Sequence, residues 1–258
     1  MGIEIGGRPL SVGTADAEAL RRRWSLNERN RIAVLLQHGQ APNGQLLGVL
    51  AERGLEPVVV SAGERSEKLP DPQWVNVAIL AGSHRYRGPA GHEWLARELD
   101  WLRQADEAGT AVLGIGHGAR AMAAAFGGRV EAAPRPNRGW TMLSTSVPHI
   151  VAAGPWLSWQ HDLIRLPPTA ELLAHNRFGP QAFRVGRHLA IHFHPEATPH
   201  TLTTWVAGSD DDLDATELLA ITSRDPVARD VCARRLFSSF VDAVEGITDR
   251  RDARTAVA

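Results

Sequence analysis

The stretch "TAVLGIGHGARAMAAAFGG", residues 110–128, joins an apolar run to an alanine-rich segment through closely spaced glycines. The residues "TAVLGI" are typical of a short buried strand, and the alanine-rich residues after it favour a helix. Gly116 lies where the strand must turn sharply into the helix. Glycine accepts the unusual backbone angles of such a turn without a steric penalty. The stretch therefore predicts a strand, a tight turn and a helix.

The segments before this turn alternate in the same way. "RIAVLLQHG" (31–39) and "VNVAILAGS" (75–83) are apolar runs, and Val58 to Val60 form a shorter β-branched run. Between them, Leu46, Leu47, Leu50 and Ala51 keep helical spacing, and "GHEWLARELDWLRQADEAG" (91–109) is amphipathic with the same period. Continuous apolar strands that alternate with helices predict an α/β fold with three layers: a mostly parallel sheet with helices on both faces.

The pattern changes beyond residue 128, where the segments become shorter. We expect small antiparallel strands at the sheet edge from "GRVEAAP" (128–134), "GWTMLSTS" (139–146), "HIVAAG" (149–154) and "QAFRVGRHLAIHFHP" (181–195). A final helix is predicted over 226–244, with Asp225 as its N-cap and Pro226 at its first position. We therefore expect an N-terminal extension over 1–30, one domain over 31–246 and a frayed tail over 247–258.

Composition and charge narrow the class of partner. The 258 residues are 43% hydrophobic and 22% charged, with a formal net charge of −1. This balance carries no footprint of nucleic-acid or anionic-membrane binding, so small molecules or proteins are the expected partners. No apolar stretch approaches the roughly 20 residues that span a bilayer, and "MGIEIGGRPL" lacks the regions of a signal peptide. We expect a cytoplasmic protein.

Two motifs fit the glycine-rich turn. Gly114-x-Gly116-x-x-Ala119 after a strand matches a dinucleotide fingerprint, with Glu131 near the distance of a ribose-binding acid. That motif normally follows the first strand of its domain, whereas several strands and helices precede this one. The same residues match Gly-x-nucleophile-x-Gly, in which a strained turn presents a nucleophile and backbone N–H groups stabilise an oxyanion. In that pattern the nucleophile itself is missing.

The downstream stretch "IHFHPEATPHTLTTW" (191–205) favours the second pattern. Together, Gly114–Gly118 and Phe193–Glu196 resemble the two signatures of the class I glutamine amidotransferase family, an elbow like G-I-C-x-G and a later F-H-P-E. "AILAGS" and "WQHDLIRLPPTAELLAHNRFGPQAFRVG" (159–186) resemble further family segments in the same order. The resemblance covers roughly residues 31 to 207, most closely the small GMP-synthase-like stand-alone domains, and it implies a flavodoxin-like fold.

The resemblance implies a role for individual residues. In the family a cysteine thiolate attacks the side-chain amide of glutamine and forms a thioester, while a glutamate-oriented histidine acts as acid and base. Here the nucleophile position falls on Gly116, the acid/base on His194 and the orienting acid on Glu196. The oxyanion and substrate-binding positions fall on Gly82, Ser83, His117 and Gln160. Gln160 departs from the histidine that is common there, and glycine at 116 cannot form a thioester, so covalent glutamine hydrolysis is predicted to be absent.

The resemblance implies glutamine or a γ-glutamyl amide as the parent substrate, no cofactor, and a separate acceptor enzyme or a small amine as partner. Three readings stay open: an amidotransferase whose cysteine was replaced, a repurposed scaffold in a biosynthetic pathway that uses His194 as a non-covalent general acid/base, and a non-catalytic binding protein. "HFHPE" taken alone also suggests a metal site formed by His192, His194, Glu196 and His200. With the family pattern accounting for His194 and Glu196, we predict no bound metal.

Overall fold

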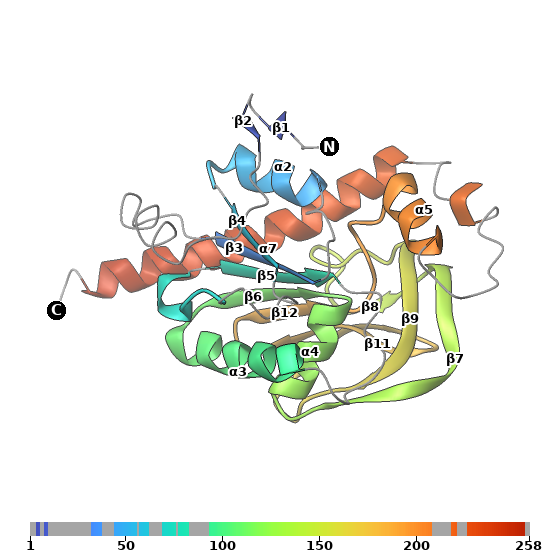
Figure 1. The fold of residues 1–258 in the computed structure, drawn as a ribbon, viewed down its shortest axis with the longest axis horizontal. Coiled ribbons are helices and arrows are strands. Elements are labelled where there is room, and N and C mark those ends of the chain that lie inside the picture. The colour runs from blue at the N-terminus through green and yellow to red at the C-terminus, as the bar shows by residue number, and fades with distance from the viewer. Residues whose placement is uncertain are drawn as a thin grey trace.

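The structure is a computed structural model, and it describes residues 4–5, 8–9, 32–37, 44–55, 57–61, 69–75, 77–82, 93–207, 218–220 and 226–255. A central sheet lies between two layers of helices, with a long two-stranded ribbon beside it (Figure 1). Within these residues, no helix combines the length and apolar character needed to cross a membrane.

The central sheet is mixed, and its parallel strands lie side by side at one end of the strand order. Eight described strands follow the order β4-β3-β5-β6-β12-β11-β10-β8, and the pairings from β4 through β12 are parallel. The parallel strands are β3 (Ile32–Gln37), β4 (Pro57–Ser61), β5 (Val77–Gly82), β6 (Ala111–Ile115) and β12 (His188–Ile191). This arrangement confirms the predicted α/β fold with a mostly parallel sheet.

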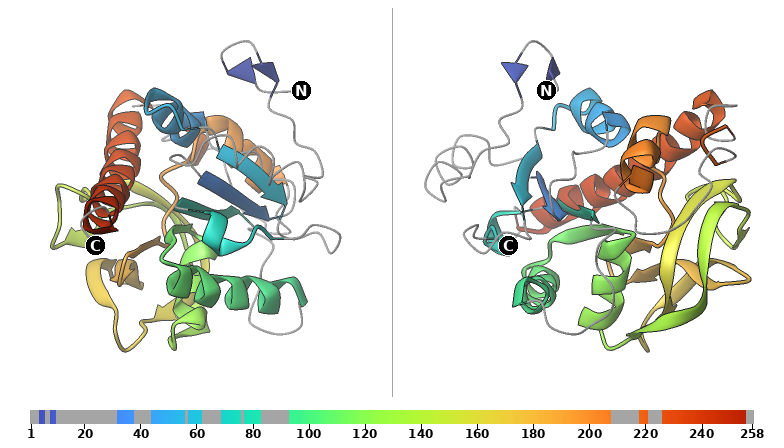
Figure 2. Two further views of the ribbon diagram at one scale, coloured as in Figure 1. Left: turned by 90° about the vertical axis from the view of Figure 1, so that its left-hand side faces the viewer. Right: turned by 45° about the vertical axis from the view of Figure 1, so that its right-hand side comes forward.

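Alternate residues of the parallel strands point into two separate cores. In β5, Val77 and Ile79 join a core with α2 (Gly44–Glu52) and α7 (Pro226–Thr255). Ala78 and Leu80 of the same strand join the opposite core, with α3 (Glu93–Ala108) and α4 (His117–Ala125). Figure 2 shows these helix pairs on opposite sides of the sheet. A strand covered on both faces needs the continuous apolar run that the sequence displays.

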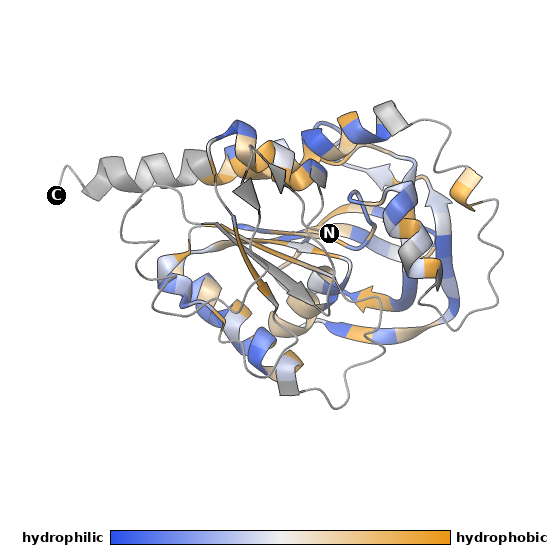
Figure 3. Cartoon of the chain, turned by 45° about the horizontal axis from the view of Figure 1, so that its top comes forward, coloured by the Kyte–Doolittle hydropathy of each residue, from blue (hydrophilic) through white to orange (hydrophobic). Residues whose placement is uncertain are grey.

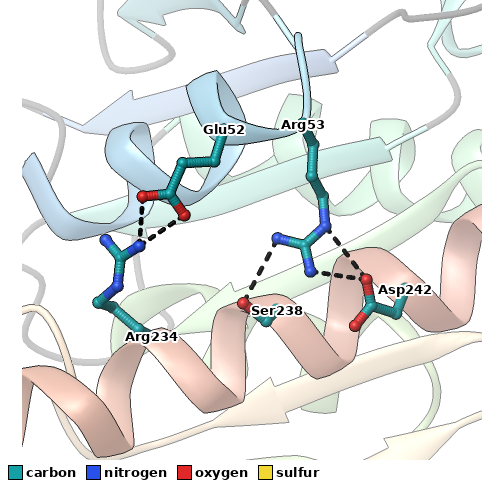
Figure 4. A network of polar contacts seen from close by, with 5 residues as sticks. All are labelled: Glu52, Arg53, Arg234, Ser238 and Asp242. Carbon is teal, nitrogen blue, oxygen red and sulfur yellow. Dashed lines mark hydrogen bonds and ion pairs between the residues drawn. The ribbon is translucent and has the colours of Figure 1, made fainter.

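Polar contacts join α2 to α7 on the outer side of the first core (Figure 4). Arg53 donates from Nε and Nη2 to Oδ1 of Asp242, at 3.1 and 2.7 Å. Arg234 donates from Nη2 to both carboxylate oxygens of Glu52 at 2.5 Å. These contacts lie at the exposed rim of an interface between two helices that are far apart in sequence.

Some of the antiparallel strands are arranged differently from the prediction. At the edge of the central sheet lie β11 (Gly179–Val185) and β8 (Ser144–Thr145), within two of the expected segments, and β10 (Glu171–Asn176), which was not predicted. The second half of the segment 181–195 forms β12, which lies inside the sheet and pairs parallel to β6, not at the antiparallel edge as expected. "GRVEAAP" and the first residues of "GWTMLSTS", however, belong to one long strand, β7 (Arg129–Thr141), which pairs with β9 (Trp156–Arg165) outside that sheet. The pairing register shifts between Ala132 and Asn137, so Pro134 and Pro136 fall where no ladder bond is needed. Hydrophilic residues are frequent along this ribbon (blue in Figure 3).

Two further expectations differ from the structure. "HIVAAG" forms no strand, because the N–H groups of Ile150 and Val151 both bond the carbonyl oxygen of Val147 in a local turn. The last helix begins at Pro226 as predicted but continues to Thr255 instead of ending at residue 244. Its expected cap, Asp225, lies outside the described residues. Short strands β1 (Glu4–Ile5) and β2 (Arg8–Pro9) pair within the N-terminal segment.

Candidate functional site

The predicted strand-to-helix turn is present, with Gly116 between β6 and α4. Its backbone angles are φ 55° and ψ −99°, in a region that side chains with a Cβ rarely occupy. Its N–H donates to the carbonyl oxygen of Ile191 on the neighbouring strand at 2.8 Å. At Gly118 a Cβ atom would overlap the backbone of Leu80. Glycine is therefore required at residue 118 for the helix to start so close to the sheet, and at residue 116 it avoids the strain of a positive φ.

His194 lies directly opposite this turn. A short connection follows β12, and the N–H of His194 bonds the carbonyl oxygen of Leu157 at 2.8 Å. A Cβ atom on Gly116 would lie 2.6 Å from Cε1 and 3.2 Å from Nε2 of the His194 ring. The ring thus occupies the space that a side chain at residue 116 would enter, and its Nε2 faces the turn.

Glu196 holds the His194 ring from the other side. Nδ1 of His194 and Oε1 of Glu196 are 2.6 Å apart, and the side chains are 15% and 13% exposed. The ring also packs edge-on against Trp205 of helix α5 (Pro199–Ala207), with centroids 4.7 Å apart. Because a carboxylate only accepts, Nδ1 carries the hydrogen, which leaves Nε2 of the neutral ring as an acceptor. The structure therefore brings together Gly116, His194 and Glu196, three of the residues singled out from the sequence.

A buried carboxylate that the sequence reasoning missed lies behind the turn. Oε2 of Glu98, on α3, is 2.5 Å from Nε2 of His117, and neither side chain is exposed. The ring of Trp94 meets the His117 ring edge-on at 5.4 Å. The sequence does contain an indication of this buried acid, because Glu98 shares the four-residue spacing of the apolar residues Trp94 and Leu102. An acid on the apolar stripe of an amphipathic helix indicates a buried partner.

A second buried ion pair joins the same helix to the ribbon. Nη1 of Arg120, on α4, is 2.5 Å from Oδ2 of Asp162 on β9, and the side chains are 9% and 7% exposed. Arg120 was also missed from the sequence, although it lies one helical turn after Gly116 in an otherwise small-residue segment.

Gln160 belongs to a buried network of amides. Its Oε1 accepts from Nδ2 of Asn137 at 2.9 Å, and its Nε2 donates to Oε1 of Gln181 at 3.0 Å. Both bonds fix the direction of the amide, because its oxygen serves as the acceptor and its nitrogen as the donor. The Gln160 side chain is thus held rigidly from β7 and β11.

His192 lies beneath this network. Burial, followed by the nearby charges of Arg120 and His194, holds the pKa of His192 well below its ordinary 6.5. A neutral imidazole at this position therefore forms part of the floor of the site at neutral pH.

These groups line a small, partly open pocket with a cavity volume of about 20 Å³. Its described lining consists of Gly116, His117, Arg120, Trp159, Gln160, His161, His192 and His194. Gly82 ends β5, with a φ of 108°, and is not among these lining residues. Ser83 lies outside the described residues. An acceptor at His194, donors at Arg120 and Gln160 and a tight turn together suit proton transfer on a small polar ligand.

The sequence also suggested a dinucleotide site and a metal site, and the structure gives the surroundings of their residues. Glu131, the acid of the dinucleotide motif, lies in β7 and pairs with Arg165 across the ribbon at 2.9 Å. In the part of the chain that the structure describes, no three His, Cys, Asp or Glu side chains are grouped so that they could hold a metal ion.

Comparison with solved structures shows which fold this is. The chain superposes on a glutamine amido transferase from Methylobacillus flagellatus with a TM-score of 0.74 and 17% identity, covering 83% of this chain and 95% of that one. It superposes on a glutamine amidotransferase from Thermotoga maritima with a TM-score of 0.71 and 20% identity, covering 82% and 99%. At these identities the likeness establishes the fold.

Comparison of sequences shows the family as well as the fold. A GMP synthase [glutamine-hydrolyzing] from Thermomicrobium roseum is 35% identical over 102 residues, which are 37% of this chain and 19% of that protein. The chain thus matches less than a fifth of that relative's length. The family model described as glutamine amidotransferase class-I matches residues 38–206, well over half of the chain. The chain therefore belongs to the class-I glutamine amidotransferase family.

Proposed function

We propose that this protein uses an amidotransferase pocket for non-covalent acid–base chemistry, with His194 as the general acid/base and Gly116 at the position of the family's nucleophile. The observation that carries this proposal is the place of the His194 ring. Where a nucleophile's Cβ would stand, Cε1 of His194 lies 2.6 Å away. A thiol at residue 116 would have to displace the ring that is meant to serve it.

The His194–Glu196 pair supports an active role for the imidazole. Hydrogen bonding to Glu196 at 2.6 Å orients the ring and fixes which of its nitrogens faces the turn. Nε2, which faces the turn, would accept a proton from water or from the substrate and return it to a leaving amine. In this scheme a water molecule takes the part that a cysteine plays in the family. Its oxygen forms the new bond to the amide carbon as its proton passes to Nε2.

The single cysteine of the chain does not replace the missing nucleophile. Cys232 lies on α7 and packs against the core between α2, α7 and the sheet. It is not among the described residues that line the pocket. We therefore propose amide hydrolysis or transfer without a thioester, on glutamine, a γ-glutamyl amide or a related amide, with any acceptor supplied by a separate protein or small amine.

The test is release of ammonia or amine from a panel of small amides, with mass spectrometry of the intact protein to detect an acyl adduct. We expect turnover without an adduct, and a loss of about 10²–10⁴-fold in His194→Ala. His149→Ala, a change at an exposed histidine outside the pocket lining, is the matched control and should keep full activity.

Gly116→Cys supplies the opposite test. Because the new side chain meets the His194 ring, we expect this variant to fold but to give little glutamine hydrolysis. Strong hydrolysis with a trapped γ-glutamyl adduct would show instead that the pocket is still built for covalent chemistry. Absence of turnover of every amide by the wild-type protein would also contradict the proposal.

A further inference from the structure

The charges around the pocket are distributed unevenly. Among the described residues that line it are one guanidinium, four imidazoles, an amide and an indole, and none is acidic. A second guanidinium stands close behind this wall, because Arg138 donates from Nη2 to Nε2 of His161 at 2.8 Å and lies over the Trp159 ring at 5.5 Å. The described wall thus offers positive charge and hydrogen-bond donors.

The neighbouring carboxylates are engaged by the side chains that form the wall. Asp162 pairs with Arg120, Glu196 with His194 and Glu98 with His117, each at 2.5 or 2.6 Å. These acids orient the wall residues. Against this described part of the wall, an ammonium group on a ligand would meet Arg120 and the neutral ring of His192, and like charge at short range opposes binding.

Arg120 is held in a fixed position within the wall. Asp162 fixes Nη1 at 2.5 Å, and the side chain is only 9% exposed. A guanidinium that is held by one carboxylate is preorganised to receive another, because its N–H groups form a planar fork matched to two oxygens. Little side-chain entropy is then lost when the ligand arrives.

We propose that the pocket binds a small carboxylate that carries no ammonium group beside it, with the carboxylate on Arg120 and the reacting group at Nε2 of His194. This inference rests on the proposed function and names its substrate class. A ligand of this class differs from a zwitterionic amino acid such as glutamine, because it has no ammonium group. The carboxamide oxygen or amine of such a ligand would also meet the rigid amide of Gln160.

The first experiment compares probes that differ in the charged groups they carry, by calorimetric titration of the full chain. Glutaramate is glutamine without its ammonium group, and glutaramide replaces the remaining carboxylate by a neutral amide. We expect glutaramate to bind at least about tenfold more tightly than glutaramide and more tightly than L-glutamine. If L-glutamine binds as well as glutaramate, or if no carboxylate binds, the inference is wrong.

Variants test whether Arg120 provides the selectivity. Arg120→Gln with Asp162→Asn removes both charges of the buried pair together and should abolish the preference for glutaramate over glutaramide. Arg184→Gln is the matched control, because Arg184 is also paired with a carboxylate, that of Glu171, but is about half exposed. A preference that survives in the double variant would overturn the assignment.

Asp162→Asn alone gives an effect of opposite sign. The amide oxygen of asparagine can still accept from Nη1 of Arg120 and hold the guanidinium in place, while loss of the carboxylate charge leaves Arg120 less compensated. Glutaramate should therefore bind more tightly, by a few-fold, although the fold is weakened. A purely structural ion pair would give no gain, and the absence of a gain therefore counts against the inference. Binding is measured without turnover, so a protein that binds glutaramate but hydrolyses nothing refutes only the proposed catalysis. One that hydrolyses amides without charge selectivity refutes only this inference.

Discussion

Glu98 and His117 meet inside the protein at 2.5 Å, with both side chains fully buried, directly behind the turn that carries Gly116. His117 is the first residue of α4, and its backbone N–H is one of the groups that the family resemblance assigns to the oxyanion site. The contact ties this residue to α3, so the helix start is braced by a buried polar pair as well as by close packing.

Glu98→Ala should therefore destabilise the protein strongly. Removing one partner of a buried pair leaves the other polar group without compensation, which typically costs about 3–5 kcal/mol of unfolding free energy. Glu107→Ala changes an exposed glutamate of the same helix and should stay within about 0.5 kcal/mol of the wild type. Urea denaturation of the two variants measures the difference. Equal losses would show that the pair contributes nothing beyond helix propensity.

Gly116→Ala and Gly186→Ala separate backbone strain from the clash with His194. The two glycines have almost the same φ, 55° and 56°, but a Cβ on Gly186 meets nothing within 4 Å. Each variant should lose about 1–2 kcal/mol through its positive φ. Gly116→Ala should lose more, because the His194 ring must also move. Thermal melting measures both, and a difference near zero would mean that the ring yields freely.

The contact of Arg53, the residue after α2, with Asp242 of α7 should add little to stability. Asp242 is 59% exposed, so solvent screens the pair, and a double-mutant cycle on alanine variants should give a coupling of about 0.2–1 kcal/mol. The apolar contacts of the same interface, such as Phe237, which is fully buried, should dominate. Phe237→Ala is expected to cost about 3–5 kcal/mol. A coupling larger than that loss would reverse this ranking.

The parallel half of the fold was predictable because its strands are buried on both faces. Val77 to Leu80 form a continuous apolar run for that reason, and the spacing of Leu46 and Leu50 reports one helix face directly. The antiparallel half was harder to predict, since β7 contains two prolines and its pairing with β9 depends on a register shift that local sequence does not reveal. Elements whose order depends on distant pairing are poorly marked by their own residues.

The residues of the candidate site also divide into those that local sequence predicts and those that it does not. Gly116, His194 and Glu196 lie in two short motifs, and their meeting follows once β6 and β12 are neighbours. Arg120 and Asp162 are 42 residues apart, and no local pattern pairs them. A charged residue among alanines indicates an unusual environment, but the partner that neutralises it is identified only when α4 packs against the ribbon.

His192 should make stability depend on pH below neutrality. Its pKa is held well below 6.5 in the folded protein, chiefly by burial, whereas the unfolded chain takes up the proton near 6.5. The unfolded state therefore binds more protons as the pH falls below 6.5, and unfolding becomes easier, by at most about 1.4 kcal/mol per pH unit for one histidine. Above that pH the contribution is constant.

His192→Gln should flatten this dependence between pH 6.5 and 5, whereas His149→Gln, a change at an exposed histidine, should leave it unchanged. Part of the slope should persist in His192→Gln, because burial also lowers the pKa of His188, against the opposing effect of Asp106. Unfolding free energies measured in urea across this range decide the matter. An unchanged slope in His192→Gln would mean that this ring accepts a proton in the folded protein, and that the floor of the pocket becomes charged in this pH range.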